Sequence, residues 1–152
     1  MKRHIILLFF LSVNVIYSQA QLLNQRKKWE FEKWPQMFKD RAFCLCLIEG
    51  YQDSVIRKSI LTLDKSYYDP IAISIFDTTL LPVIRNEVAQ INAKEKKSYK
   101  TMHEGAAGRR VFSHCMDFYK SARLDSLLRK TKLQWQKIKD IDEVIYRNMP
   151  AF

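Results

Sequence analysis

Glycine, proline and histidine are scarce in this sequence, which has three glycines, four prolines and three histidines among 152 residues. A β-rich fold needs glycine and proline at its many turns, so their scarcity favours helices. A structural zinc site draws its ligands from paired cysteine and histidine spacings. The three cysteines form one Cys-x-Cys pair and a distant single residue, which is not such a pattern. We therefore expect no metal and no other cofactor.

Sequence patterns of catalysis are also missing. The chain contains no Gly-rich phosphate loop and no Gly-x-Ser-x-Gly motif. His114 and Cys115 are neighbours, so on a helix their side chains point about 100° apart and cannot form a nucleophile–base pair. Glu49 and Asp117 are the acids in core-like segments, and a helix cap or a local ion pair explains them better than catalysis does. These absences favour a binding protein over an enzyme.

Residues 1–20 have the pattern of a secretory signal peptide. A charged start precedes an almost unbroken apolar run at 5–16, and small residues follow at a cleavage site. The apolar run is too short to span a bilayer. We expect an exported protein in which residues 21–33 form a polar lead-in and residues 34–152 form one helical domain.

The sequence is strongly basic, with a formal net charge of +10 at pH 7. In an exported protein such a charge suits an acidic protein partner, a membrane surface or the cell wall. Nucleic acid is the weakest of the candidate partners, because it is rarely met outside the cytoplasm. Basic residues on solvated helix faces would give the same charge without any partner. Charge alone therefore leaves these interpretations open.

Apolar residues at helical spacing predict two helices in the first part of the domain. Pro35 can occupy the first turn of one helix, and Gly50 can stop it. Residues 43–48 are apolar on nearly all sides, so we expect this helix to be central. Asp53 or Ser54 can cap the second helix. The apolar face of the second helix consists of Ile56, Ile60, Leu63 and Tyr67.

Capping and breaking residues organise the rest of the chain. Asp69 and Pro70 can begin a helix, which Pro82 is expected to kink or split. Within 109–128, Ser121 separates two helices, and one or two short helices follow. The sequence therefore predicts an all-α, compact helical bundle of about five to seven helices.

Between these helices, Asn92–Gly108 loses the apolar period and becomes rich in lysine. We expect this stretch to be the longest loop and the most natural place for an exposed interaction element. The candidate contact residues are Lys96, Lys97, Tyr99 and His103. The alternative is a mobile charged linker.

Export would place the cysteines in an oxidising compartment, where disulfides persist. Cys44 and Cys46 lie two residues apart on a helix and point to different sides, so one can bond Cys115 while the other stays a small apolar side chain. A bond between residues 46 and 115 closes a loop of about 70 residues, and the chain-entropy model gives such a bond roughly 4 kcal/mol.

Two segments resemble a known family. Residues 46–51, Cys-Leu-Ile-Glu-Gly-Tyr, and residues 114–125, which run from His-Cys-Met-Asp-Phe-Tyr to Leu-Asp, are similar to motifs of the Tai4 family of type VI secretion amidase immunity proteins. The likeness covers about residues 38–130, and Cys44 and the basic C-terminal tail have no counterpart in it. The matching structural positions include Gly50, Tyr51, Asp117, Tyr119, Ser121 and Leu124.

The resemblance implies a small, helical, periplasmic protein that forms homodimers. Such proteins bind a cognate Tae4-type effector, a papain-like peptidoglycan amidase, and occlude its active site, which protects the producing cell. The catalytic residues then belong to the effector, and neither nucleic acid nor stable membrane insertion is expected. Both Cys46 and Cys115 lie in the motifs, and we expect the disulfide between them, with Cys44–Cys115 as the alternative. The rival hypothesis is a periplasmic basic module that binds a membrane surface or the cell wall.

Overall fold

The computed structural model describes residue 21 and residues 32–149. The expected signal peptide and most of the expected lead-in lie outside the described residues. The chain divides into two compact units, Met1–Pro35 and Gln36–Phe152, and almost all described residues belong to the second.

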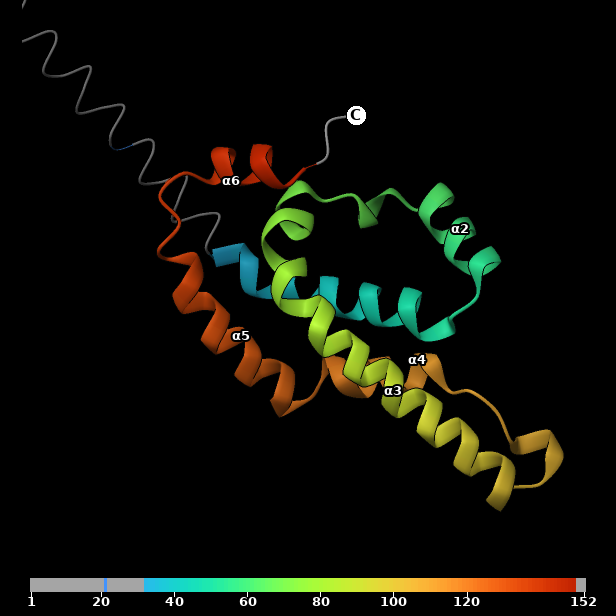
Figure 1. Cartoon of the computed structure of the whole chain (residues 1–152). Helices are drawn as coiled ribbons and strands as arrows, with labels where there is room; N and C mark the ends of the chain where they lie inside the picture. The colour runs from blue at the N-terminus through green and yellow to red at the C-terminus, as the bar shows by residue number, and fades with distance from the viewer. Residues whose placement is uncertain (1–20, 22–31, 150–152) are drawn as a thin grey trace, which may run out of the picture. The chain divides into compact units, whose positions relative to one another are not determined.

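The described residues are helical throughout the fold and contain no strand, which confirms the all-α prediction (Figure 1). The first helix covers residues 32–51 and is called the 32–51 helix below. The elements that follow it are α2 (Ser54–Leu63), the 3-10 turn η1 (Lys65–Tyr67), the π-helical η2 (Ala72–Phe76), α3 (Asp77–Thr101), the 3-10 turn η3 (Glu104–Ala106), α4 (Val111–Tyr119), α5 (Ala122–Trp135) and α6 (Ile141–Asn148).

Side-chain caps begin three helices where the sequence predicted a start. The carboxylate of Asp53 accepts the backbone N–H groups of Val55 and Ile56 at 2.8 and 2.9 Å, so Asp53 rather than Ser54 is the cap of α2. Asp69 accepts the Ala72 N–H at 2.8 Å. Ser121 Oγ accepts the Leu124 N–H at 3.1 Å and separates α4 from α5, as expected.

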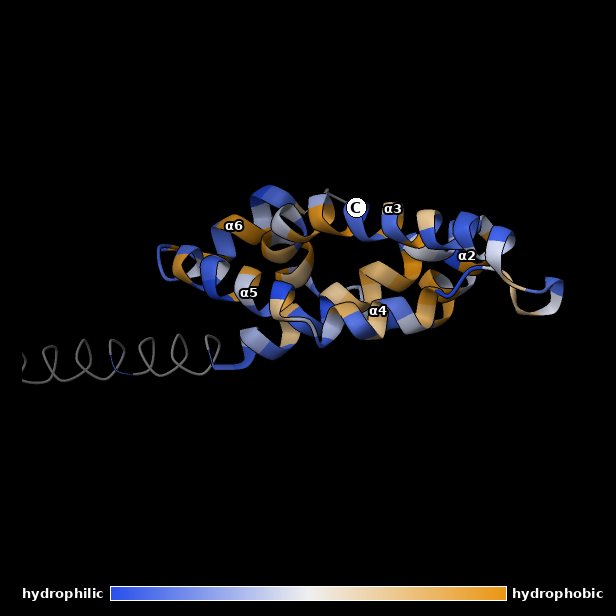
Figure 2. Cartoon of the chain, turned by 90° about the horizontal axis from the view of Figure 1, so that it is seen from below, coloured by the Kyte–Doolittle hydropathy of each residue, from blue (hydrophilic) through white to orange (hydrophobic). Residues whose placement is uncertain are grey.

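An aromatic cluster forms part of the core of the second unit. The ring of Phe38 lies 5.5 Å from the rings of Phe76 and Trp135, and these last two rings are 5.1 Å apart. All three residues are buried. The cluster joins the 32–51 helix, η2 and α5. In Figure 2, the ribbon of α5 contains both apolar and polar residues.

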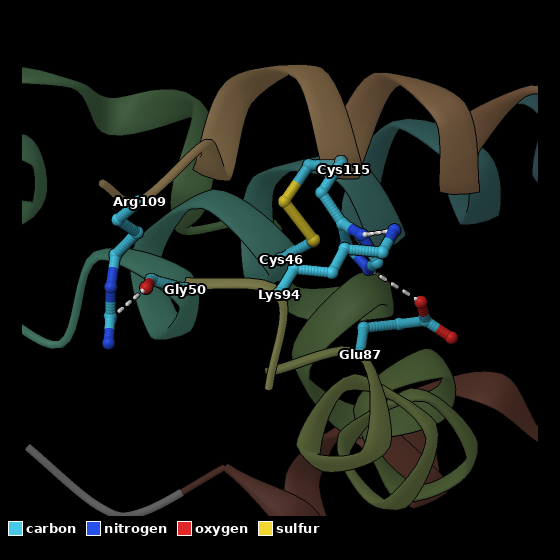
Figure 3. The surroundings of a disulfide bond; sticks show 7 residues. Cys46, Gly50, Glu87, Lys94, Arg109 and Cys115 are labelled. Carbon is cyan, nitrogen blue, oxygen red and sulfur yellow. Dashed lines mark hydrogen bonds and ion pairs between the residues drawn. A yellow bond between two sulfur atoms is a disulfide. The ribbon is translucent and has the colours of Figure 1, made fainter. Parts of the chain in front are cut away.

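A disulfide between Cys46 and Cys115 joins the 32–51 helix to α4, with the two Cα atoms 5.7 Å apart (Figure 3). The bond is the one expected, and Cys44 is the free cysteine. Both bonded cysteines are fully buried.

Gly50 does not stop the helix as predicted but lies inside it, one residue before its end. A Cβ atom on Gly50 would come within 2.7 Å of Val111 Cγ1 and 3.2 Å of Ile91 Cδ1. The position therefore requires glycine because α3 and α4 pack directly against its backbone, not because the chain turns there.

Pro82 lies inside α3 and does not split it, so of the two predicted outcomes, a kink or a split, the split is wrong. The proline ring removes the hydrogen bond to the carbonyl of Thr78, four residues earlier. Both Pro82 and Thr78 are exposed, so water can satisfy that carbonyl.

The prediction of a loop over Asn92–Gly108 is wrong. Helix α3 continues to Thr101, and only a short connection containing η3 joins it to α4. Within this stretch the buried position of α3 is occupied by the polar Ser98, so the apolar period disappears although the helix continues. The exposed lysines of this stretch are good helix formers.

Candidate functional site

The four predicted contact residues lie at the end of α3 and directly after it. Lys96, Lys97 and Tyr99 belong to the last two turns of the helix, and His103 precedes η3. All four are exposed, and Tyr99 keeps 64% of its surface. Lys96 and Tyr99, three residues apart, share a face, whereas Lys97 points to another side. The structure thus presents them on a helix end instead of a long loop.

A cavity of about 290 Å³ lies between the end of α3, the connection after it and α4. Lys97 is the one predicted contact residue that lines it. Other lining residues are Ile91, Lys94, Met102, Arg110, His114 and Asp117. The cavity therefore combines apolar walls with several charged groups.

A series of polar contacts runs from Lys94 and His114 in the lining of this cavity to the buried Glu87 (Figure 3). Lys94 Nζ lies 3.0 Å from His114 Nδ1, and His114 Nε2 lies 2.9 Å from a carboxylate oxygen of Glu87. An ammonium group only donates, so Nδ1 accepts and the proton on Nε2 is donated to Glu87. The other carboxylate oxygen of Glu87 accepts from Arg123. Only 7% of His114 and 3% of Glu87 are exposed, so these contacts fix the imidazole ring in place, while Lys94 is exposed and contacts it from the surface.

From the sequence, His114 is considered only as a base for Cys115 and rejected in that role, and Glu87 is not identified. Glu87 lies at helical spacing between Ile84 and Ile91 on the buried face of α3. A carboxylate at such a position needs partners, because an unpaired buried charge is costly. An acid at a position where the helical pattern predicts an apolar residue was the sequence signal for this buried polar contact.

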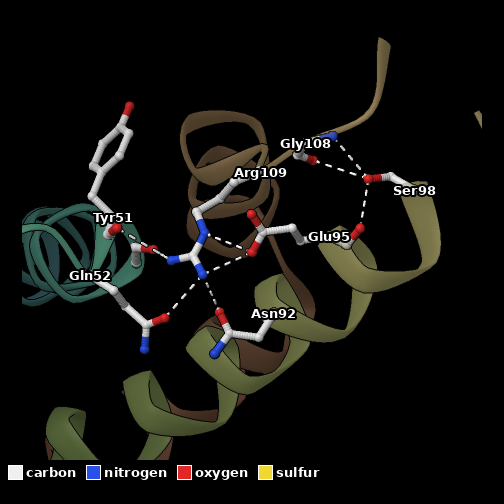
Figure 4. A network of polar contacts seen from close by, with 8 residues as sticks. Tyr51, Gln52, Asn92, Glu95, Ser98, Gly108 and Arg109 are labelled. Carbon is white, nitrogen blue, oxygen red and sulfur yellow. Dashed lines mark hydrogen bonds and ion pairs between the residues drawn. The ribbon is translucent and has the colours of Figure 1, made fainter. Parts of the chain in front are cut away.

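A second polar network surrounds Arg109, just before α4 (Figure 4). Its guanidinium donates to the Gly50 carbonyl at 2.6 Å and to the Tyr51 carbonyl at 3.3 Å, at the C-terminal end of the 32–51 helix. It also donates to Asn92 at 2.7 Å and to Glu95 at 2.9 and 3.0 Å. A cation at the C-terminus of a helix stabilises the free carbonyls there. Arg109 therefore holds three segments together.

The family-motif positions differ in their surroundings. Leu124 is fully buried, Ser121 caps α5, and the Tyr119 hydroxyl is 2.9 Å from Gln36 Nε2. Tyr51 is 37% exposed, and Asp117 lies on the exposed side of α4, where it lines the cavity. The buried face of α4 consists of Val111, His114, Cys115 and Phe118.

Helix α2 contains no buried residue. Of its predicted apolar face, Ile56 is 38% and Leu63 is 83% exposed, so this face is not covered within the described chain. Beside α2 lies a cavity of about 510 Å³, whose rim includes Arg85 and the pair formed by Arg57 and Glu49 at 2.6 Å. Glu49 thus forms the local ion pair that the sequence favoured.

Arg41 and Cys44 line a third cavity of about 250 Å³. The guanidinium of Arg41 donates to both carboxylate oxygens of Asp77 at 2.8 and 2.6 Å. Burial on its own would lower the pKa of Arg41. The hydrogen bond and the negative charge of Asp77 outweigh the effect of burial, so the pKa of Arg41 is raised. Burial also raises the pKa of the Cys44 thiol. Cys44 therefore has the character of an inert apolar side chain.

Comparisons with family models, curated proteins and solved structures find no match to this chain. The described residues contain no group of three or more acids, histidines and cysteines arranged to hold a metal ion. Among the helices described, none has the length and apolarity to cross a membrane. The functional argument therefore depends on the motifs and on the geometry of the α3–α4 end.

Proposed function

We propose that this chain is a periplasmic immunity protein that binds a cognate type VI secretion amidase effector of the Tae4 kind, occludes its active site and so protects the producing cell. In this proposal the chain is not an enzyme, has no cofactor and acts as a homodimer. The proposal rests on the resemblance of two sequence segments to the Tai4 family.

The observation that carries the proposal is the Cys46–Cys115 disulfide. It joins the two segments that resemble the family, one on the 32–51 helix and one on α4, although they are 69 residues apart. One helical turn from the disulfide, the backbone of Gly50 lies against Val111, and its carbonyl accepts a hydrogen bond from Arg109. Cys46, Gly50 and Cys115, three residues of the two matching segments, thus lie at one contact between the 32–51 helix and α4, and this supports the proposal.

The proposed effector-binding surface is the exposed end of α3 with the connection that follows. It offers the ring of Tyr99, the 45% exposed side chain of Met102, and three cations, which are Lys96, Lys97 and Arg110. Tyrosine, methionine and arginine are enriched in protein interfaces. Cations around them would speed the association with an acidic effector face.

The test replaces Lys96, Lys97, Tyr99 and His103 together by alanine. We expect binding of the effector to weaken by about tenfold or more, because removing central aromatic and charged contacts has effects of this size. The matched control replaces Lys130, Lys137 and Tyr146, which are also exposed, by alanine. An affinity unchanged in the first variant would exclude this surface.

The rival function is a basic module that binds anionic membrane surfaces or the cell wall. Co-sedimentation with liposomes of anionic lipid, at low and high salt, separates the two functions. Salt-sensitive binding to the liposomes, with no capture of an amidase, would favour the rival.

A further inference from the structure

We infer that the cavity between α3 and α4 binds the carboxylate side chain of a glutamate or aspartate on a partner protein. The assignment of that partner as the amidase effector rests on the proposed function. The affinity of the cavity for a carboxylate does not, because it follows from the residues that line the cavity.

Positive charge dominates the lining. Lys94, Lys97 and Arg110 all line the cavity. Of the two carboxylates in the lining, Glu95 is held by Arg109 at 2.9 Å, which leaves Asp117 as the one that opposes an anion. An incoming carboxylate therefore meets more cations than acids and can form charge-assisted hydrogen bonds.

Lys94 is the best-positioned cation. Its ammonium group donates to His114 Nδ1 at 3.0 Å, and His114 is in turn held by Glu87 at 2.9 Å. An ammonium group has three donors, so a neutral acceptor on one of them leaves two for a ligand. His114 orients Lys94 without neutralising its charge, because the accepting nitrogen carries none. This hydrogen bond to a buried ring restricts the position of the exposed Lys94 ammonium group before binding, which lowers the entropic cost.

Arg110 comes from the segment just before α4 and has spare donors. Among the described residues its contacts are made by the Nη2 nitrogen and are long, at 3.4 Å to the Ala106 carbonyl and 3.9 Å to the sulfur of Met102. A guanidinium group has five N–H donors and binds carboxylates through two of them at once.

The apolar walls select an anion on an aliphatic chain. Ile91, which is only 2% exposed, and Met102 line the same cavity as the cations. Its volume of about 290 Å³ exceeds that of a carboxylate group alone, so the methylenes of an acidic side chain can fill the rest. A compact, strongly hydrated ion such as phosphate would leave the apolar walls uncovered.

The test titrates the oxidised, ¹⁵N-labelled protein with N-acetyl-glutamate N-methylamide and follows the ring nitrogens of His114 and the amides of Ser98 and Gly108. We expect saturable shifts with a dissociation constant of about 10 mM or tighter. The glutamine analogue, which has the same shape without the charge, should cause no saturable shift. Equal shifts from both probes, tighter binding of inorganic phosphate, or no saturable shift would each overturn the inference.

Substitutions of the lining residues test whether the glutamate probe binds in this cavity. Lys94→Met and Arg110→Met should each weaken binding of the glutamate probe by about fivefold to tenfold, and Lys130→Met should leave it unchanged. Asp117→Asn should tighten binding, because it removes the opposing carboxylate. Arg110→Met does not touch His114, so it keeps the test valid where Lys94→Met disturbs the contacts of His114. Unchanged affinity in both Arg110→Met and Asp117→Asn would contradict the inference.

The probe titration needs no effector, so failure of the proposed function and failure of this inference give different results. Capture of an effector by a protein that ignores the glutamate probe would retain the function and reject the cavity. If the protein binds the probe but captures no effector, the affinity of the cavity for a carboxylate is retained and the assigned partner is rejected.

Discussion

Arg109 Nη1 donates a 2.6 Å hydrogen bond to the carbonyl oxygen of Gly50, across 59 residues of sequence. The contact lies near the Cys46–Cys115 disulfide and ends the 32–51 helix with a cation (Figures 3 and 4). One polar contact and one covalent bond thus fix the start of α4 against that helix. Four predictions about this joint and its surroundings follow from the contacts described above.

Replacing Arg109 by methionine should lower the free energy of unfolding by about 2–4 kcal/mol. The change removes a charged donor from two helix carbonyls and leaves Glu95 without its cation. Urea denaturation followed by circular dichroism measures the loss. Arg110→Met is the control and should stay within about 0.5 kcal/mol, because its contacts are long and exposed. Equal losses in both variants would contradict the role of Arg109.

Replacing Gly50 by alanine should destabilise the protein by about 1–3 kcal/mol, although alanine is the better helix former. The new methyl group would come within 2.7 Å of Val111 Cγ1. Val111→Ala in the same chain removes that clash, so the double variant should be more stable than the sum of the two single losses predicts. A double-mutant cycle measured by urea denaturation checks this, and strict additivity would reject the close approach.

Replacing Cys46 and Cys115 together by alanine should lower the free energy of unfolding by about 2–5 kcal/mol, since the bond closes a long loop. Cys44→Ala removes the remaining thiol and should cost about 1 kcal/mol or less. Reduction of the unchanged protein should bring its urea midpoint down towards that of the double variant. If Cys44→Ala were the more damaging change, the pairing would be wrong.

Cys44 should react slowly with thiol reagents in the native, oxidised protein. The thiolate is the reactive form, and burial raises the pKa of this thiol, so a smaller fraction is ionised at a given pH. The pH midpoint of the rate should lie above the value of about 8.5 for a free cysteine. The rate of reaction with a chromophoric disulfide, measured at a series of pH values, gives this midpoint, and one thiol per folded chain should react. A midpoint below that value would contradict the burial.

The sequence was sufficient for the helical class and the caps because these depend on local chemistry. Asp53, Asp69 and Ser121 can accept backbone N–H groups wherever a helix follows them. Such caps need no knowledge of what packs on the other side of a helix. The Cys46–Cys115 bond joins two distant helices, so local chemistry left Cys44 as an alternative partner of Cys115.

The mistakes share one cause, which is packing between distant segments. Gly50 was assigned to a helix end because nothing nearby shows that Val111 approaches its backbone. The end of α3 is mistaken for a loop because the polar Ser98 occupies its buried face, where an apolar residue signals a helix. The Oγ of Ser98 accepts the Gly108 N–H at 3.0 Å, a partner that the fold brings close just before α4.

The measurement that tests the central claim most directly is a binding and inhibition assay between the exported form of this chain, residues 21–152, and the product of the neighbouring gene. The account predicts that a small Cys-His amidase binds, and that its hydrolysis of peptidoglycan stops when the two proteins are present in equal amounts. It further predicts that the variant with alanine at Lys96, Lys97, Tyr99 and His103 relieves the inhibition. An active amidase that neither binds this chain nor slows in its presence would contradict the account.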